Sequence, residues 1–105
     1  MTIEEWYNLL KNLSENTSYD VIMKKKIQNP VVAIVPKWRD TPQRVAIYPR
    51  KTKNAGLVFE EDVYSVPEIQ ALAGDADRVH SNRPHFNNVS DEKIIKICKL
   101  FLMKK

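Results

Sequence analysis

The fold is constrained most strongly by a run of five apolar residues at 31–35, which has Pro30 before it and Pro36 after it. Four of the five side chains are β-branched, which favours a strand. A short continuous run of this kind is typical of a strand that is covered, or nearly covered, on both faces. No other uninterrupted apolar run is longer, whereas a membrane-spanning helix needs about 20 apolar residues. The sequence therefore predicts a buried strand in a sheet and no membrane span.

Three further segments have the spacing or composition of strands. Residues 19–26 and 44–48 each alternate between two sets of side chains, which is the pattern of a strand with one face buried. Residues 57–59 form a short apolar segment after a basic loop. Because the connections between the four strands are short, we expect strands that are neighbours in the sequence to pair as an antiparallel meander.

Three helices are predicted. Residues 3–15 place their apolar side chains on one helical face. The segment that begins at Ser65 has the form of a capping box for a short helix that ends at Gly74. Ser90 is expected to cap a helix that continues to residue 103. The apolar stripe of this last helix consists of Ile94, Ile95, Cys98, Phe101 and Leu102.

A chain of 105 residues is the size of one domain. The expected fold class is α+β: a single domain over residues 1–105, in which an N-terminal helix, a short middle helix and a C-terminal helix pack on a four-stranded, mainly antiparallel meander sheet. The single cysteine, Cys98, excludes an intrachain disulfide and fits a reducing compartment. The N-terminus opens with acidic residues instead of a secretory signal, so we expect a cytoplasmic protein.

The net charge of +4 conceals a segregation of charge along the chain. Residues 24–54 contain nine Lys or Arg and one acid, Asp40, whereas residues 55–77 contain six acids and no base. In an antiparallel meander the basic segment would cover both rims of the sheet and one of its faces, with aromatic side chains among the bases. Lys and Arg attract polyphosphate, and aromatic rings can stack on unpaired bases. These features predict a small basic domain that binds DNA or RNA.

The predicted nucleic-acid-binding residues come from this basic segment and from the polar segment 75–89. They are Lys24, Lys26, Lys37, Trp38, Arg39, Arg44, Tyr48, Arg50, Lys51, Lys53, Arg78, His80, Arg83 and His85. The position of Trp38 distinguishes two cases, because an exposed ring would anchor a partner and a ring under the sheet would belong to the core. We expect Trp38 to be partly buried.

Residues 75–89 show no regular pattern, and we expect a long polar loop there. The segment contains both histidines of the chain, His80 and His85, so a small metal-independent ribonuclease is one alternative function. The two residues are five apart, which on an extended segment places them on opposite sides and argues against an acid–base pair. Polar side chains in such a segment more often form hydrogen bonds with backbone groups of the loop or cap helices.

A second alternative is a protein-interaction module, such as an inhibitor or an accessory subunit from a mobile element. Its acidic and basic faces would dock on an unidentified protein, or on a second copy in a homodimer. The two charged segments could also pair within one molecule, since strand 57–61 should lie beside strand 44–50. One cysteine and two histidines do not make a standard zinc site, and two glycines exclude Gly-rich phosphate loops, so we expect neither metal nor cofactor.

Overall fold

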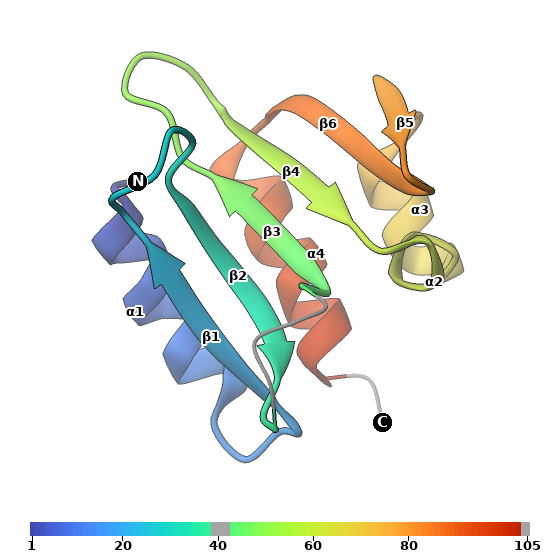
Figure 1. The fold of residues 1–105 in the computed structure, drawn as a ribbon. Coiled ribbons are helices and arrows are strands. Elements are labelled where there is room, and N and C mark those ends of the chain that lie inside the picture. The colour runs from blue at the N-terminus through green and yellow to red at the C-terminus, as the bar shows by residue number, and fades with distance from the viewer. Residues whose placement is uncertain (39–42, 104–105) are drawn as a thin grey trace.

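The computed structural model describes residues 1–38 and 43–103, and within them it shows an α+β fold with one antiparallel sheet and four helices. The α+β class predicted from the sequence is therefore confirmed. None of the helices in these ranges is long and apolar enough to cross a membrane. The elements in Figure 1 are α1 (Ile3–Ser14), β1 (Tyr19–Lys24), β2 (Val31–Pro36), β3 (Val45–Tyr48), β4 (Ala55–Phe59), α2 (Glu61–Tyr64), α3 (Pro67–Ala73), β5 (Arg78–His80), β6 (Arg83–Val89) and α4 (Asp91–Met103).

The sheet has six strands among the described residues, so the predicted number of four was wrong. The strand order is β1-β2-β3-β4-β6-β5. Strands β1 to β4 pair with their neighbours in the sequence, and every residue of β2 is buried. The run at 31–35 is therefore the covered strand that its composition predicts. Strand β6 pairs with β4 on one side and with β5, the edge strand, on the other.

The two additional strands lie in the segment 75–89, which forms a hairpin instead of the predicted loop. Ser81 and Asn82 make the two-residue turn, with φ angles of 53° and 63°. Positive φ at both central residues is the geometry of a type I′ turn, whose twist suits a hairpin. Ser-Asn is a weaker signal for this turn than Asn-Gly, and Pro84 within β6 lowers the strand signal further.

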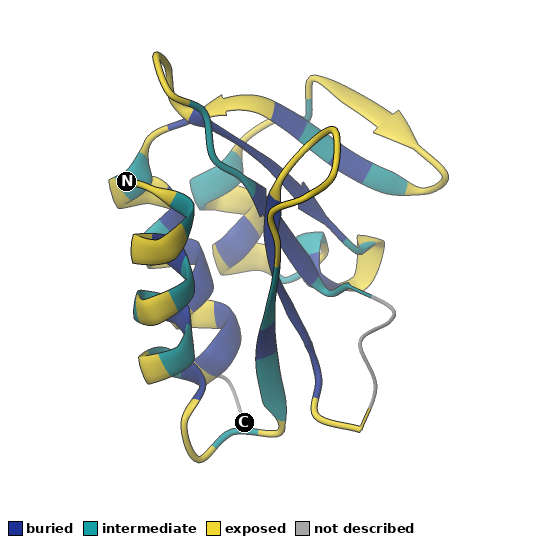
Figure 2. Ribbon diagram, turned by 60° about the vertical axis from the view of Figure 1, so that its left-hand side comes forward, coloured by how far each residue is buried: buried dark blue, intermediate teal, exposed yellow. Residues whose placement is uncertain are grey.

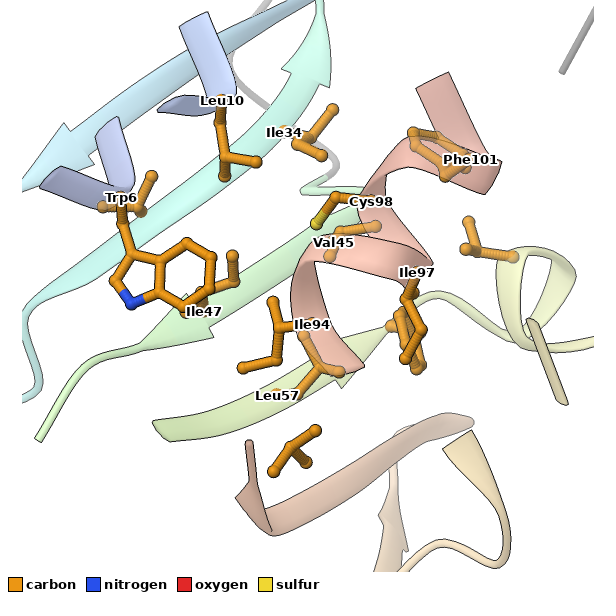
Figure 3. Packing of buried hydrophobic residues seen from close by; sticks show 14 of the residues in the cluster. Trp6, Leu10, Ile34, Val45, Ile47, Leu57, Ile94, Ile97, Cys98 and Phe101 are labelled. Carbon is orange, nitrogen blue, oxygen red and sulfur yellow. The ribbon is translucent and has the colours of Figure 1, made fainter. Parts of the chain in front are cut away.

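The main core lies on one face of the sheet. In Figure 1, α1 lies behind β1 and β2, and α4 lies behind the middle strands. Figure 3 shows Trp6 and Leu10 of α1 and Ile94 of α4 packed toward sheet residues such as Ile47, and all four side chains are fully buried. Cys98 belongs to the same core, and burial raises the pKa of its thiol to about 12. The last helix therefore packs through four of the five predicted residues, whereas Ile97, which was not predicted, is fully buried and Ile95 is only partly buried.

The ends of the later helices follow local chemistry. The hydroxyl of Ser90 accepts a hydrogen bond from the backbone N–H of Lys93 at 3.3 Å, as its predicted capping role requires. Gly74 follows α3 with a φ of 75°, as expected for a glycine stop. The predicted capping box at Ser65 was wrong, because its hydroxyl donates to the carbonyl of Glu61. That serine ends the short helix α2, which the sequence pattern did not reveal, and α3 begins without a side-chain cap.

No helix among the described residues covers the other face of the sheet, which we call the open face. Figure 2 shows that the central strands nevertheless stay buried, while the loops at the strand ends and strand β5 are exposed. Small apolar side chains form the centre of the open face, and none of them is more than 8% exposed. These residues are Val31, Ala33, Val35, Ala46 and Val58.

Candidate functional site

A depression of about 480 Å³ opens in the open face beside strands β4 and β6. Its walls come from three parts of the chain: the β1–β2 loop, the segment that follows β3, and the β5–β6 hairpin. Four predicted binding residues line it: Tyr48, Arg50, Arg78 and His85. The fold thus brings together side chains that lie far apart in the sequence.

Arg50 is held beside the backbone of β4 and β6. Its guanidinium donates a hydrogen bond to the carbonyl oxygen of Asn87. It also lies against Gly56, because a Cβ atom at that position would stand 3.2 Å from Arg50 Nη2. Gly56 therefore leaves the space in which the guanidinium packs. A guanidinium has five N–H donors, so Arg50 keeps donors for a ligand after binding to Asn87.

The β5–β6 hairpin brings two arginines and two histidines to the open face. Arg78 pairs directly with His85 across the two strands, and His80 pairs with Arg83. Directly opposite residues of an antiparallel pair lie on one face, and so do residues two apart in a strand. We call these four side chains the His/Arg block. The ring centroids of His80 and His85 are 6.3 Å apart, so the expectation that they point to opposite sides was wrong. The two-residue turn reverses the chain between them.

The surroundings of His85 favour its neutral form. Burial lowers the pKa of His85 below its ordinary value, and the charges of Arg78, His80 and Arg83 lower it further. The same charges attract an anion. A phosphate bound here would stabilise the imidazolium, so anion binding and protonation of His85 would be coupled.

Tyr48 stands between this depression and a smaller one of about 330 Å³. Gln28 and Asn29 line both depressions, and Lys24 lines the second. The two depressions therefore form one track across the open face, from the end of β1 to the hairpin. The Tyr48 side chain is partly exposed on this track, where an aromatic ring can stack on a planar group.

The structure places Arg44 and Arg83 in internal contacts. The Arg44 guanidinium lies 3.0 Å from a carboxylate oxygen of Glu60 and 2.6 Å from one of Asp62. Arg83 donates a hydrogen bond to the carbonyl oxygen of Gln43. The acidic segment thus neutralises part of the basic segment within the molecule, which is the intramolecular pairing that the neighbouring strands predict.

The other predicted binding residues lie at two opposite ends of the sheet. The β1–β2 and β3–β4 connections share one end (Figure 1). Lys26, Lys51 and Lys53 lie in these connections, and Lys24 is the last residue of β1 at the same end. Lys37 and Trp38 follow β2 at the other end, away from the depression that holds Arg50. Trp38 is 71% exposed, so the expectation of partial burial was wrong. Arg39 lies outside the described residues.

Sequence reasoning missed Gly56, although a signal for it existed. The chain has only two glycines, and this one lies beside a predicted strand. A glycine within a strand often marks the close approach of another group, which here is Arg50. The carbonyl groups of Asn87 and Gln43 that hold Arg50 and Arg83 gave no signal, because every residue supplies a carbonyl.

No protein-family model matches the chain, and no curated protein or solved structure shows significant similarity to it. Within residues 1–38 and 43–103, no three His, Cys, Asp or Glu side chains gather in an arrangement that would hold a metal ion. Two guanidinium groups, one imidazole and a tyrosine ring around one depression suit a ligand that carries both negative charge and planar groups.

Proposed function

We propose that this protein is a small nucleic-acid-binding domain that takes a single strand of RNA or DNA along its open face. The observation that carries the proposal is the convergence of Arg50, Arg78 and His85 on one depression with Tyr48 at its border. Cations beside an aromatic ring match the two chemical parts of a nucleotide, a phosphate and a planar base. The binding energy would come from phosphate contacts and base stacking, so little sequence preference is expected.

The charges of the site are available to a ligand. Among the described residues, no carboxylate lies within ion-pair distance of Arg50 or Arg78. Arg44, in contrast, is already paired with Glu60 and Asp62. Arg50 and Arg78 are therefore the arginines that we expect to contact phosphate, and Arg44 is expected to contribute to stability.

The shape of the site favours a single strand over a duplex. A duplex is usually bound by a helix or ribbon that protrudes into a groove, whereas this site is hollowed into a sheet face. The track crosses the sheet from β1 to β5, which is about 24 Å at the usual spacing of strands. A track of this length is of the order of four nucleotides, at the lower end of the range for small single-strand-binding domains.

Fluorescence anisotropy tests the proposal. Labelled single strands of about twelve nucleotides, as RNA and as DNA, and the matching duplex would be titrated with the protein at low salt. We expect the single strands to bind more tightly than the duplex. The variant Arg50→Ala/Arg78→Ala should lose about tenfold or more in single-strand affinity, because a hydrogen bond to a charged group contributes about 1.5–3 kcal/mol.

The matched control removes the same charge from the other side of the sheet. Lys93→Ala/Lys99→Ala changes two exposed lysines on α4, and we expect it to bind nearly as the wild type does. Equal losses in the two double variants would contradict the proposed site, because net charge alone would then explain the affinity. No binding by the wild type even at low salt would rule out the nucleic-acid function and leave the protein-interaction prediction.

A further inference from the structure

The His/Arg block has an arrangement that binding alone does not require. Its two histidines occupy one diagonal of the hairpin face, and Arg78 and Arg83 occupy the other. The imidazole planes of His80 and His85 are inclined at 78°, with 6.3 Å between their centroids. Two imidazoles thus lie close together on one face of the hairpin, and each has an arginine directly opposite it on the other strand.

The separation of the two rings fits an acid and a base that act on the same phosphodiester. A general acid or base must approach the oxygen that it serves to within about 2.6–3.2 Å. The attacking and leaving oxygens stand on opposite sides of one phosphorus atom, so the acid and the base must both lie within reach of the same phosphate. Ring centroids 6.3 Å apart allow both contacts at once.

We propose that the His/Arg block cleaves single-stranded RNA by internal transesterification, with His85 as the general base and His80 as the general acid. The proposal rests on the proposed function, since the RNA must lie along the open face. The substrate class is narrower than the class that binds: only a strand with a 2′-hydroxyl can react. His80 and His85 would touch the reacting atoms and are therefore catalytic residues in this account.

The proposed step needs no oxidant, metal ion or cofactor. His85 removes the proton of a 2′-hydroxyl, and the 2′-oxygen attacks the adjacent phosphorus. The bond between phosphorus and the 5′-oxygen of the next nucleotide breaks, and His80 in its imidazolium form gives a proton to that oxygen. The products are a 2′,3′-cyclic phosphate and a 5′-hydroxyl, and solvent returns the two histidines to their initial protonation states.

The groups around His85 suit the role of a base. Arg78 faces it from β5, His80 lies diagonally across, and Arg83 lies two residues away on its own strand. On the β4 side its partner is the uncharged Val58, and Arg50 and Tyr48 line the same depression as His85. Burial and the surrounding cations lower the pKa of His85, which keeps the ring neutral near pH 7. Arg78 and Arg50 would stabilise the extra negative charge on phosphorus in the transition state.

The test uses a labelled DNA strand that contains one ribonucleotide. The strand is incubated with the whole protein in the presence of a metal chelator, because the proposed step needs no metal ion. We expect a single cut on the 3′ side of the ribonucleotide, with a 2′,3′-cyclic phosphate detected by mass spectrometry. The all-deoxy strand should stay intact. His80→Ala and His85→Ala should each lower the cleavage rate about 100-fold or more, as is usual for loss of a general acid or base. Lys93→Ala, on α4, serves as the control that should cleave as the wild type does.

Parallel anisotropy measurements separate the two proposals. Cleavage that persists in His80→Ala and His85→Ala would overturn the catalytic proposal, because it would point to a contaminating nuclease. Wild-type protein that binds RNA and leaves it intact would overturn catalysis and preserve binding. Protein that neither binds nor cleaves would overturn both. The variant His85→Gln provides a second test of the base, since it keeps a polar side chain without the ability to accept a proton at neutral pH.

Discussion

The contact between Gly56 and Arg50 is the residue-level feature on which the site depends most closely. A methyl group at position 56 would stand 3.2 Å from Arg50 Nη2, which is too close for an undisturbed contact. Since that nitrogen is the end of a flexible side chain, we expect the guanidinium to move and the fold to survive. Gly56→Ala should therefore lower single-strand affinity several-fold with little change in melting temperature, as measured by anisotropy and circular dichroism.

Gly74 provides the opposite control. It has a φ of 75° and no heavy atom within 4 Å of a built Cβ, so an added methyl group meets backbone strain and no neighbour. Gly74→Ala should lower the free energy of unfolding by about 1 kcal/mol, because non-glycine residues rarely adopt this conformation. The affinity of the Gly74→Ala variant for a single strand should equal that of the wild type. If Gly56→Ala binds like the wild type, the proposed role of Arg50 is wrong.

The second residue-level prediction is that single-strand affinity depends on pH through His85. Its pKa is lowered in the free protein, chiefly by burial. A bound phosphate favours the imidazolium and raises the pKa of His85 in the complex, so the complex takes up a proton. Affinity for an all-deoxy strand should therefore rise as the pH falls from 8 to 5, and His85→Gln should reduce this rise. An affinity that is independent of pH in this range would contradict phosphate contact at His85.

At the scale of elements, the sequence predicts best the segments that bury a continuous apolar stripe. Strand β2 and helix α4 have such stripes, at 31–35 and along Ile94, Cys98 and Phe101, and both were predicted. The β5–β6 hairpin lacks one, because all of β5 is exposed and β6 is only partly buried. Burial pattern is the main sequence signal for a strand, so the hairpin stayed hidden, although its residues Arg78 and His85 were predicted to bind.

The turn between β5 and β6 holds the four side chains of the His/Arg block together. Asn82 has a φ of 63°, which glycine adopts freely and a β-branched residue does not. Asn82→Gly should keep the hairpin, whereas Asn82→Val should disorder it and separate His80 from Arg83. Single-strand affinity should then be retained in the first variant and lost about tenfold in the second, a change of about 1.4 kcal/mol. Equal affinities would show that the hairpin does not contribute to binding.

At the scale of the whole molecule, charge is both paired internally and exposed. Lys25 bonds to Glu4 between the β1–β2 loop and α1, and Arg44 bonds to Asp62. The segregation along the chain is thus partly cancelled in the fold, which a linear charge map cannot show because it carries no contacts. The net charge of +4 therefore does not describe any single face of the molecule. On the open face, Arg50 and Arg78 are the arginines that line the main depression.

The salt dependence of the affinity measures how many cationic side chains contact phosphate groups of the bound strand. A single strand that contacts about three cations should give a slope near −2 for log affinity against log salt, because each neutralised phosphate contributes about −0.7. Arg50→Ala/Arg78→Ala should make the slope shallower by about 1.4. A slope near zero would indicate that binding, if present, comes from contacts other than phosphate.

Amide chemical-shift mapping by NMR would locate the bound strand on the protein. Protein labelled with nitrogen-15 would be titrated with an all-deoxy single strand of about twelve nucleotides. The account predicts that the largest shifts occur on the open face, at Tyr48, Gly56, Val58 and His85, and that the amides of α1 and α4 shift little. Shifts concentrated on α4, or spread evenly over the lysine-rich loops, would show that the open face is not the binding surface.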